Sequence, residues 1–181
     1  MKLLIASDIH GDFECAKKII DAFFAEGADK LVLLGDILYH GPRNDLPEGY
    51  APKKVISLLN ENRERILAVR GNCDTEVDQM VLDFPILADY AYIAVDGISI
   101  FATHGHKYNT KDTPPLLPGE ILLHGHTHVI ASEPFGNKNL YLNPGSASIP
   151  KENNPKSYMV YEKRCFTVKD FDGNIVKETK I

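Results

Sequence analysis

The stretch Leu31-Val32-Leu33-Leu34-Gly35-Asp36 decides the fold of this 181-residue chain. Four consecutive aliphatic residues are typical of a strand that is buried on both faces, as in a parallel or mixed sheet covered from both sides. Gly35 allows the backbone to turn sharply after the strand. Asp36 then lies at the carboxyl end of the strand, where open α/β sheets place their ligand sites. We therefore expect a covered sheet with a functional carboxylate at its edge.

Two further strands are predicted next to this one. Residues 3–7 form an apolar run, and residues 12–26 carry apolar side chains at helical spacing with Asp12 as the N-cap. Strand, helix and strand in this order imply a parallel pair with a right-handed crossover. A long irregular loop over 39–52, a helix over 53–65 and a strand over 66–69 follow.

The rest of the chain is predicted to be mostly strands. Asp96-Gly97 is a two-residue turn signal between two strand-like runs, and it predicts a hairpin. The predicted strands cover residues 90–95, 98–103, 121–123, 140–142, 157–161, 165–170 and 175–178. The chain has the length of one domain and shows no linker or internal repeat, so we predict a single domain over residues 1–181.

Charge and composition exclude some classes of protein. A net charge of -5 argues against an extended nucleic-acid-binding face, which would normally be basic, but not against a small phosphate substrate. No apolar run is long enough to cross a bilayer, so no membrane association is expected. Asp8 and His10 follow the first apolar run at once, which argues against a signal peptide. Three cysteines far apart in the sequence fit reduced thiols, and we expect a cytoplasmic location.

Metal-capable side chains follow the predicted strands. They are Asp8, His10, Asp36, Asn72, His104, His126 and His128. Seven ligands exceed the four of a tetrahedral zinc site, and they predict two metal ions. Asp36 is the expected bridge, because a carboxylate can offer one oxygen to each ion. Mixed imidazole and carboxylate ligands favour Mn, Fe, Zn, Ni or Co over Ca or Mg, and two-metal sites suit in-line displacement at phosphorus. With two divalent ions, two carboxylates and one bridging hydroxide, the formal charge is about +1.

These residues also form a family pattern. The motifs Asp8-Ile9-His10, Gly35-Asp36, Gly71-Asn72-Cys73-Asp74, His104-Gly105-His106 and Gly125-His126-Thr127-His128 resemble the five blocks of the calcineurin-like metallophosphoesterases, in the family's order. The loops at 41–44, 47–52 and 143–146 make the chain most similar to the small bacterial YfcE-type phosphodiesterases. The resemblance implies an α/β (α+β) fold, a four-layer αββα sandwich of two facing mixed sheets flanked by helices.

The resemblance also implies an assignment of residues. The first metal would be held by Asp8, His10, Asp36 and His128, and the second by Asp36, Asn72, His104 and His126. Two divalent ions, most often Mn²⁺, with Zn²⁺, Fe, Ni²⁺ or Co²⁺ as alternatives, would serve the in-line attack of a dimetal-bound hydroxide on a phosphodiester. The candidate catalytic residues are Asp36, Asn72, Cys73 and His104. The candidate substrate contacts are Arg43, Asn72 and Cys73.

One position departs from the family's pattern. Many members have a histidine after the asparagine of the third block, where this chain has Cys73. A thiol carries no positive charge and is a weaker hydrogen-bond donor, so the general acid stays unassigned. His106 and His124 are expected to pack beside the ligands rather than to bind metal. Arg43 either clamps a phosphate or is a solvated surface side chain.

Two other functions remain as alternatives. A phosphomonoesterase or protein phosphatase of the same fold needs the same ligands, and a metal-binding scaffold for protein partners needs fewer of them. Because all seven ligands are retained, we favour the enzyme, a phosphoric diester hydrolase acting on a small substrate. A homo-oligomer is possible through the apolar residues Phe84, Ile86, Leu87, Tyr90 and Tyr92, which equally fit a core.

Overall fold

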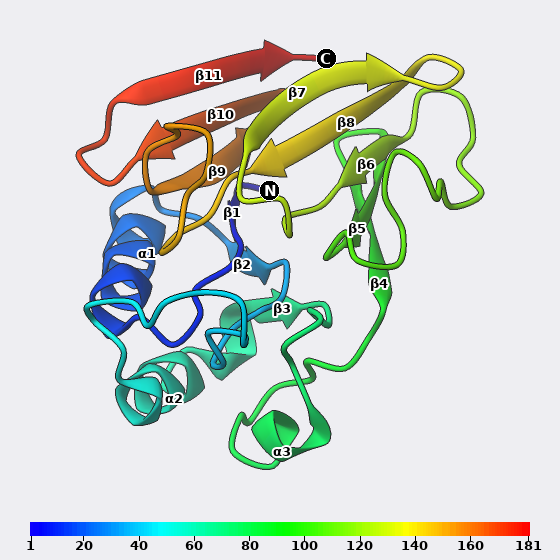
Figure 1. Cartoon of the computed structure of the whole chain (residues 1–181). Coiled ribbons are helices and arrows are strands. Elements are labelled where there is room, and N and C mark those ends of the chain that lie inside the picture. The colour runs from blue at the N-terminus through cyan, green and yellow to red at the C-terminus, as the bar shows by residue number, and fades with distance from the viewer.

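Two mixed β-sheets face each other in the computed structural model, which describes residues 1–181 (Figure 1). One sheet has six strands in the order β11-β10-β9-β1-β2-β3, and the other has five in the order β4-β5-β6-β8-β7. The first contains β1 (Leu3–Ala6), β2 (Lys30–Leu33), β3 (Ile66–Ala68), β9 (Ser157–Glu162), β10 (Cys165–Asp170) and β11 (Ile175–Lys180). The second contains β4 (Tyr90–Val95), β5 (Ile98–Thr103), β6 (Ile121–Leu123), β7 (Ile130–Phe135) and β8 (Asn139–Pro144).

The aliphatic run of β2 is buried on both faces, as predicted. Leu31 and Leu33 belong to the core between the six-stranded sheet and the helices. Val32 and Leu34 belong to the core between the two sheets. Successive side chains of a strand point to opposite faces, so one apolar run contributes to both cores. The parallel pairing of β1 with β2 is also as predicted, and β3 pairs with β2 in parallel as well.

The helices lie on the outer face of the six-stranded sheet, where α1 (Phe13–Ala25) and α2 (Pro52–Asn60) pack together (Figure 1). Asp12 caps α1 by accepting a hydrogen bond from the Cys15 amide. The helix predicted over 53–65 is wrong in its last five residues, because α2 ends at Asn60 and only a 3-10 turn, η1 (Arg63–Arg65), follows. The Asn62 side chain donates to the Leu58 carbonyl, and such local bonding competes with a continuing helix.

The predicted architecture of two facing mixed sheets flanked by helices is confirmed, with few helices, all of which precede β4. On the outer face of the five-stranded sheet, residues such as Tyr108 and Leu116 of the loop after β5 pack against Phe101 and Tyr141. Two elements were not predicted, the short helix α3 (Glu76–Gln79) and strand β7. Strand β7 contains Pro134, which disfavours a central strand, and it lies at the edge of its sheet.

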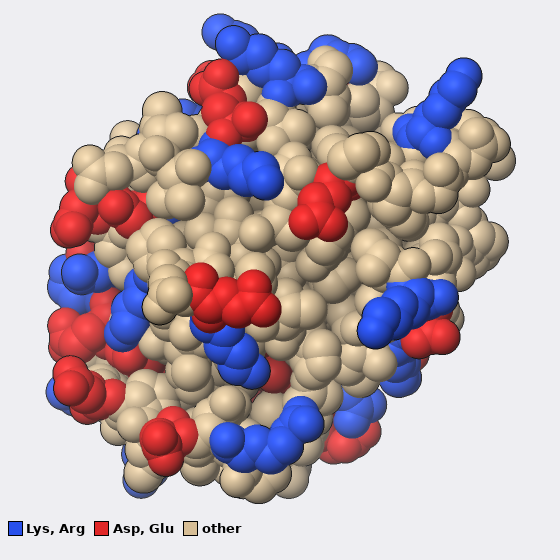
Figure 2. All heavy atoms as spheres, turned by 45° about the horizontal axis from the view of Figure 1, so that its top comes forward, with Lys and Arg blue, Asp and Glu red and all other residues tan.

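The hairpin of β4 and β5 turns at Asp96-Gly97 as predicted, with positive φ angles of 48° and 75°. Of the apolar residues considered for an interface, Phe84 and Ile86 are buried in the core, whereas Tyr90 and Tyr92 are exposed. No helix combines the length and the apolar character that crossing a membrane requires. On the face shown in Figure 2, acidic and basic side chains are interspersed and no continuous basic surface is seen.

Candidate metal centre

The loops that follow five strands meet at one edge of the facing sheets. Parallel pairing within each sheet points the carboxyl ends of β1, β2 and β3, and of β5 and β6, in common directions. The structure brings all seven candidate ligands together there: Asp8 and His10 after β1, Asp36 after β2, Asn72 after β3, His104 after β5, and His126 and His128 after β6.

A first group of donor atoms surrounds Asp8. Its Oδ1 lies 3.1 Å from His128 Nε2 and 3.6 Å from His10 Nε2. The two imidazole nitrogens are 3.4 Å apart. His10 Nε2 also lies 3.8 Å from Asp36 Oδ2. We call these four residues the closed group, because Asp8, His10 and His128 are at most 3% exposed.

A second group surrounds His104, whose Nε2 lies 3.0 Å from Asn72 Oδ1, 3.1 Å from His126 Nδ1 and 3.4 Å from Asp36 Oδ2. We call these four residues the open group, because Asn72 is exposed and His126 half-buried. Asp36 belongs to both groups through the same oxygen. Its Oδ1 instead accepts the Cys73 amide at 2.8 Å. Asp36 is thus shared by the two groups through Oδ2, whereas the expectation from the sequence was one oxygen for each ion.

The histidine rings are held in the orientation that metal binding requires. Three rings donate through Nδ1 to main-chain carbonyls: His10 to Tyr39 (2.8 Å), His104 to Leu34 (2.7 Å) and His128 to Ile149. Because a carbonyl can only accept, the Nδ1 atoms carry protons, and in the neutral rings the Nε2 lone pairs face the donor cluster. Histidine ligands of metals are usually oriented in this way. His126 differs, since it turns its Nδ1 toward the cluster.

The hydrogen bonds of the Asp8 carboxylate show whether a cation would fit among these donors. Its Oδ2 accepts from the Ser7 hydroxyl (2.6 Å) and the His126 amide (3.0 Å), but its buried Oδ1 has no hydrogen-bond partner. A buried oxygen without a partner is costly and calls for an explanation. A divalent ion among Asp8 Oδ1 and the two nearby Nε2 atoms would satisfy it, and nitrogen with oxygen is a donor set that borderline ions accept.

Strained backbone conformations aim these side chains. Five of the seven residues have positive φ angles: Asp8 (58°), His10 (49°), Asp36 (54°), His126 (65°) and His128 (61°). Non-glycine residues adopt this conformation only where the surrounding structure enforces it, at a cost of about 1 kcal/mol or more each. The concentration of strain at the donor cluster indicates a functional site.

Asp74 holds the loop around Asp36. Its buried carboxylate accepts three main-chain amides, those of Asp36 (2.8 Å), Ile37 (2.9 Å) and Gly71 (2.7 Å). A side chain at Gly71 would collide with the Asp36 carboxylate, so only glycine allows this close approach. The motif that supplies Asn72 therefore also positions Asp36.

Most of the sequence matches a known family. Residues 1–164 match the calcineurin-like phosphoesterase superfamily domain. The chain belongs to this superfamily. It is 47% identical to phosphodiesterase YfcE of Escherichia coli over 168 residues, which cover 93% of this chain and 91% of the relative. It is 28% identical to the probable metallophosphoesterase YsnB of Bacillus subtilis, with 98% and 96% of the two chains covered.

Solved structures agree with this assignment. The structure of the E. coli phosphoesterase YfcE superposes with a TM-score of 0.97 at 45% identity, over all of both chains. Vacuolar protein sorting 29 of Cryptosporidium parvum shares the fold alone, with a TM-score of 0.64 at 16% identity over 99% and 98% of the chains. Membership of the superfamily makes this phosphoesterase a metal-dependent hydrolase.

Opposite charges are paired inside the phosphoesterase site. Burial lowers the pKa of His104, but the hydrogen bond with Asp36 and the charge of Asp8 outweigh it and raise the pKa to about 9. Burial raises the pKa of Asp8, but the nearby His10 and His128 hold it well below its usual value. Burial, followed by the charge of His104, lowers the pKa of His126 to about 4. Two buried carboxylates are thus kept ionised in a site that attracts cations.

A polar groove of about 420 Å³ opens over the cluster of the phosphoesterase. Its lining includes the predicted substrate contacts Arg43, Asn72 and Cys73. Sequence reasoning missed three other lining residues, Asn44, Thr127 and Lys151. The Lys151 amide donates to the His128 carbonyl at 3.1 Å, so this lysine is anchored to a ligand-bearing loop. No sequence signal links Lys151 to the site, because it lies beyond every motif.

Two of the three remaining histidines, His124 and His106, lie near the ligands without belonging to either group. His124 is buried and stacks on Tyr141 with 4.4 Å between ring centroids, and its side chain lies against Gly105. His106 is half-buried beside the His104 ring. Both positions agree with packing beside the ligands, as the sequence predicted. The Cys73 thiol is closer to the cluster, because its sulfur forms a compact group with donor atoms of His10 and Asp36.

Proposed function

We propose that this chain is a phosphodiesterase that uses two divalent ions and in-line displacement at phosphorus. The observation that carries the proposal is the division of the seven donors into two groups that share Asp36 Oδ2. Two groups of donors that share one oxygen would hold a pair of divalent ions. Such a pair provides Lewis acidity and an activated water for attack on a phosphate ester.

Different residues would hold each of the two ions and orient the substrate. Asp8, His10 and His128 would hold one ion in a buried position. Asn72, His104 and His126 would hold the other beside the groove, where a phosphate oxygen can approach. Arg43 and Lys151 line the groove with positive charge and would orient the other phosphate oxygens.

Cys73 supports a diester rather than a monoester as substrate. Burial, followed by the charge of Asp36, raises the pKa of the thiol to about 12, so it is neutral at physiological pH. The position therefore adds no positive charge to a site whose formal charge is about +1 with both ions and one hydroxide. A monoanionic diester matches that charge better than a dianionic monoester. Without an acid at this position, good leaving groups such as phenolates are favoured.

Manganese is the proposed native ion. The four imidazoles among the seven donors favour borderline ions over Mg²⁺, which prefers oxygen ligands. A monoesterase of the same fold is the second candidate function, since Arg43 and Lys151 supply cationic groups that a dianion also needs.

The test is reconstitution of metal-free protein with Mn²⁺ or Mg²⁺, followed by assays on bis(4-nitrophenyl) phosphate and 4-nitrophenyl phosphate. We expect no activity without metal, more activity with Mn²⁺ than with Mg²⁺ at equal concentration, and faster turnover of the diester. Faster turnover of the monoester would favour the second candidate. A protein that binds both ions and cleaves neither compound would overturn the proposal and favour a scaffold.

A further inference from the structure

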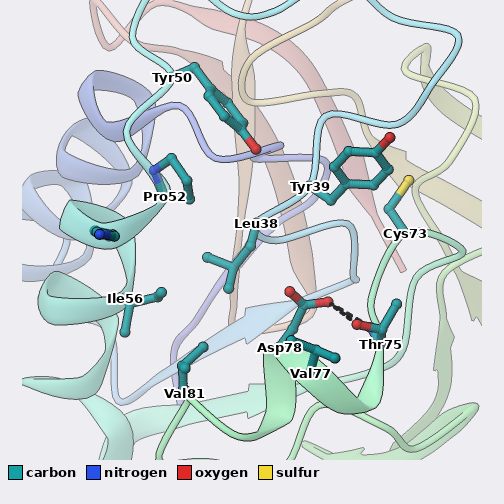
Figure 3. Close-up of a pocket in the computed structure, with 11 residues that line it drawn as sticks. Leu38, Tyr39, Tyr50, Pro52, Ile56, Cys73, Thr75, Val77, Asp78 and Val81 are labelled. Atoms are coloured by element: carbon teal, nitrogen blue, oxygen red, sulfur yellow. Dashed lines mark hydrogen bonds between the residues drawn. The ribbon is translucent and has the colours of Figure 1, made fainter.

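A second cavity of about 340 Å³ lies beside the polar groove and has the opposite character (Figure 3). It is bounded by the loop after β2, helix α2 and helix α3 and opens to solvent. Its inner walls are apolar, formed by Leu38, Ile56, Val77 and Val81, and the rings of two tyrosines line another side. Ligand pockets commonly have this size and a mainly hydrophobic lining.

Cys73 joins the cavity to the metal centre, because it lines both the cavity and the polar groove. Its amide donates to Asp36 Oδ1, so its position is fixed by the bridging residue. Tyr39, which also lines the cavity, is linked to the metal centre because its carbonyl accepts the Nδ1 proton of His10. Figure 3 shows the Tyr39 ring and the Cys73 thiol drawn next to each other at one end of the cavity. A molecule with its phosphate at the metal centre can therefore extend past Cys73 into the cavity.

Apolar surface is left exposed to water around this cavity. Val77 is 69% exposed, Val81 43% and Tyr39 41%. The Asp78 carboxylate in the lining is already engaged, because its Oδ2 accepts from the Thr75 amide (2.7 Å) and hydroxyl (2.8 Å). Exposed apolar surface next to a catalytic groove is a feature of ligand-binding sites. The lining offers mainly hydrophobic and aromatic contacts, and its other polar groups are Lys53 and the hydroxyls of Tyr39 and Tyr50.

We propose that this cavity binds an aromatic arm of the phosphodiester whose phosphate lies at the metal centre. The inference rests on the proposed phosphodiesterase function and names its substrate class, a diester with at least one aromatic ester group. The cavity volume suits a single substituted ring. Tyr39 and Tyr50 offer ring surfaces for edge or offset contacts with it. The phosphate then remains in the polar groove, near Arg43 and Lys151.

Two phosphinates test the cavity without relying on turnover. Dibenzylphosphinate and diethylphosphinate each carry one negative charge, like a diester, but their P–C bonds cannot be hydrolysed. Calorimetry would measure the binding of both to the protein loaded with Zn²⁺, a diamagnetic ion that suits the same donors. We expect the wild type to bind the dibenzyl compound at least about tenfold more tightly, since apolar burial of a ring favours binding.

The variant Val77→Asn/Val81→Asn makes the cavity wall polar at two exposed positions. We expect it to lose most of the dibenzyl preference while its affinity for diethylphosphinate stays unchanged. Met80→Asn is the matched control, because Met80 lies beside the same short helix, is 83% exposed and does not line the cavity. It should keep the wild-type preference. Equal affinities of the wild type for the two phosphinates, or an unchanged preference in the double variant, would overturn the inference.

Methyl NMR provides a second measurement on the wild type. With isoleucine δ1 methyl groups labelled, bound dibenzylphosphinate should give contacts from its ring protons to Ile56 and none to the core residue Ile86. Binding without a contact to Ile56 would place the ring elsewhere and overturn the inference. Hydrolysis of bis(4-nitrophenyl) phosphate is measured in parallel. If the protein hydrolyses this ester but binds the two phosphinates equally, only the proposal about the cavity is refuted. If it prefers dibenzylphosphinate but does not hydrolyse the ester, the proposed function is refuted.

Discussion

The closed and open groups of donors share one carboxylate oxygen but differ in their surroundings. In the closed group, Asp8 is fully buried, and the hydroxyls of Ser146 and Ser148 donate to its carbonyl. In the open group, Asn72 is exposed and His126 lines the polar groove. In the proposed two-ion site, the closed group would therefore retain its ion firmly, while the open group would exchange its ion and receive the substrate. The following predictions test this division, beginning with the largest expected effect.

Asp36→Asn should abolish most activity, because an amide is a poor bridge and both groups lose their shared oxygen. We expect kcat/KM for the aryl diester to fall at least about tenfold further than in His10→Ala, which removes a donor from one group only. Steady-state kinetics with metal analysis of each variant would measure this. If Asp36→Asn kept two ions and most of its turnover, the bridge would have to be assigned to another residue.

His128→Ala and His126→Ala should separate the two groups. His126→Ala is expected to lose one ion and to remain as stable as the wild type. His128→Ala should lose an ion and also about 1–3 kcal/mol of stability, because it removes the buried ring that lies 3.1 Å from Asp8 Oδ1 and donates to the Ile149 carbonyl. Metal content and thermal unfolding would compare the two variants. Equal losses of stability would contradict the distinction between a closed and an open group.

Cys73→His should narrow the preference for aryl diesters over aryl monoesters, by about tenfold or more if the imidazole acts as an acid. It introduces a group that can carry positive charge and protonate a leaving group beside the open group. The measurement is kcat/KM for one diester and one monoester in both proteins, with metal content as the control. A fall of all rates together would indicate that the larger ring displaces Asn72. An unchanged ratio in a variant that holds two ions would show that Cys73 does not set the substrate class.

The smallest expected effect is on the pH dependence of the melting temperature of the metal-free protein. The pKa of His104 is about 9 in the folded protein, above the ordinary value of 6.5. Its stabilising contribution is therefore complete below pH 6.5 and is lost as the pH rises through 9, where the proton shared with Asp36 leaves. We expect the melting temperature in chelator to fall by a few degrees between pH 6.5 and 9. His104→Gln should flatten this fall, and an equal slope in both proteins would disprove the assignment.

Local sequence patterns predicted much of the fold and the composition of the site. The motif residues after five strands lie at one edge, because parallel strands that end in the same direction bring their loops together. The hairpin at Asp96-Gly97 and the cap at Asp12 depend on neighbouring residues, and both predictions are confirmed. Strand β7 escaped prediction because Pro134 disfavours a strand, and only its edge position makes the proline acceptable.

The sequence by itself determined which side chains could bind metal, the order in which they occur and the buried strands that carry them. These features follow from hydrophobic periodicity and from turn residues, which act over a few positions. Only the tertiary structure decided that Asp36 shares one oxygen, that the His10 ring turns its Nε2 to the site, and that Lys151 and an apolar cavity flank the centre. Each of these depends on a hydrogen bond or contact between residues far apart in the chain, whose geometry is fixed only when both cores are packed.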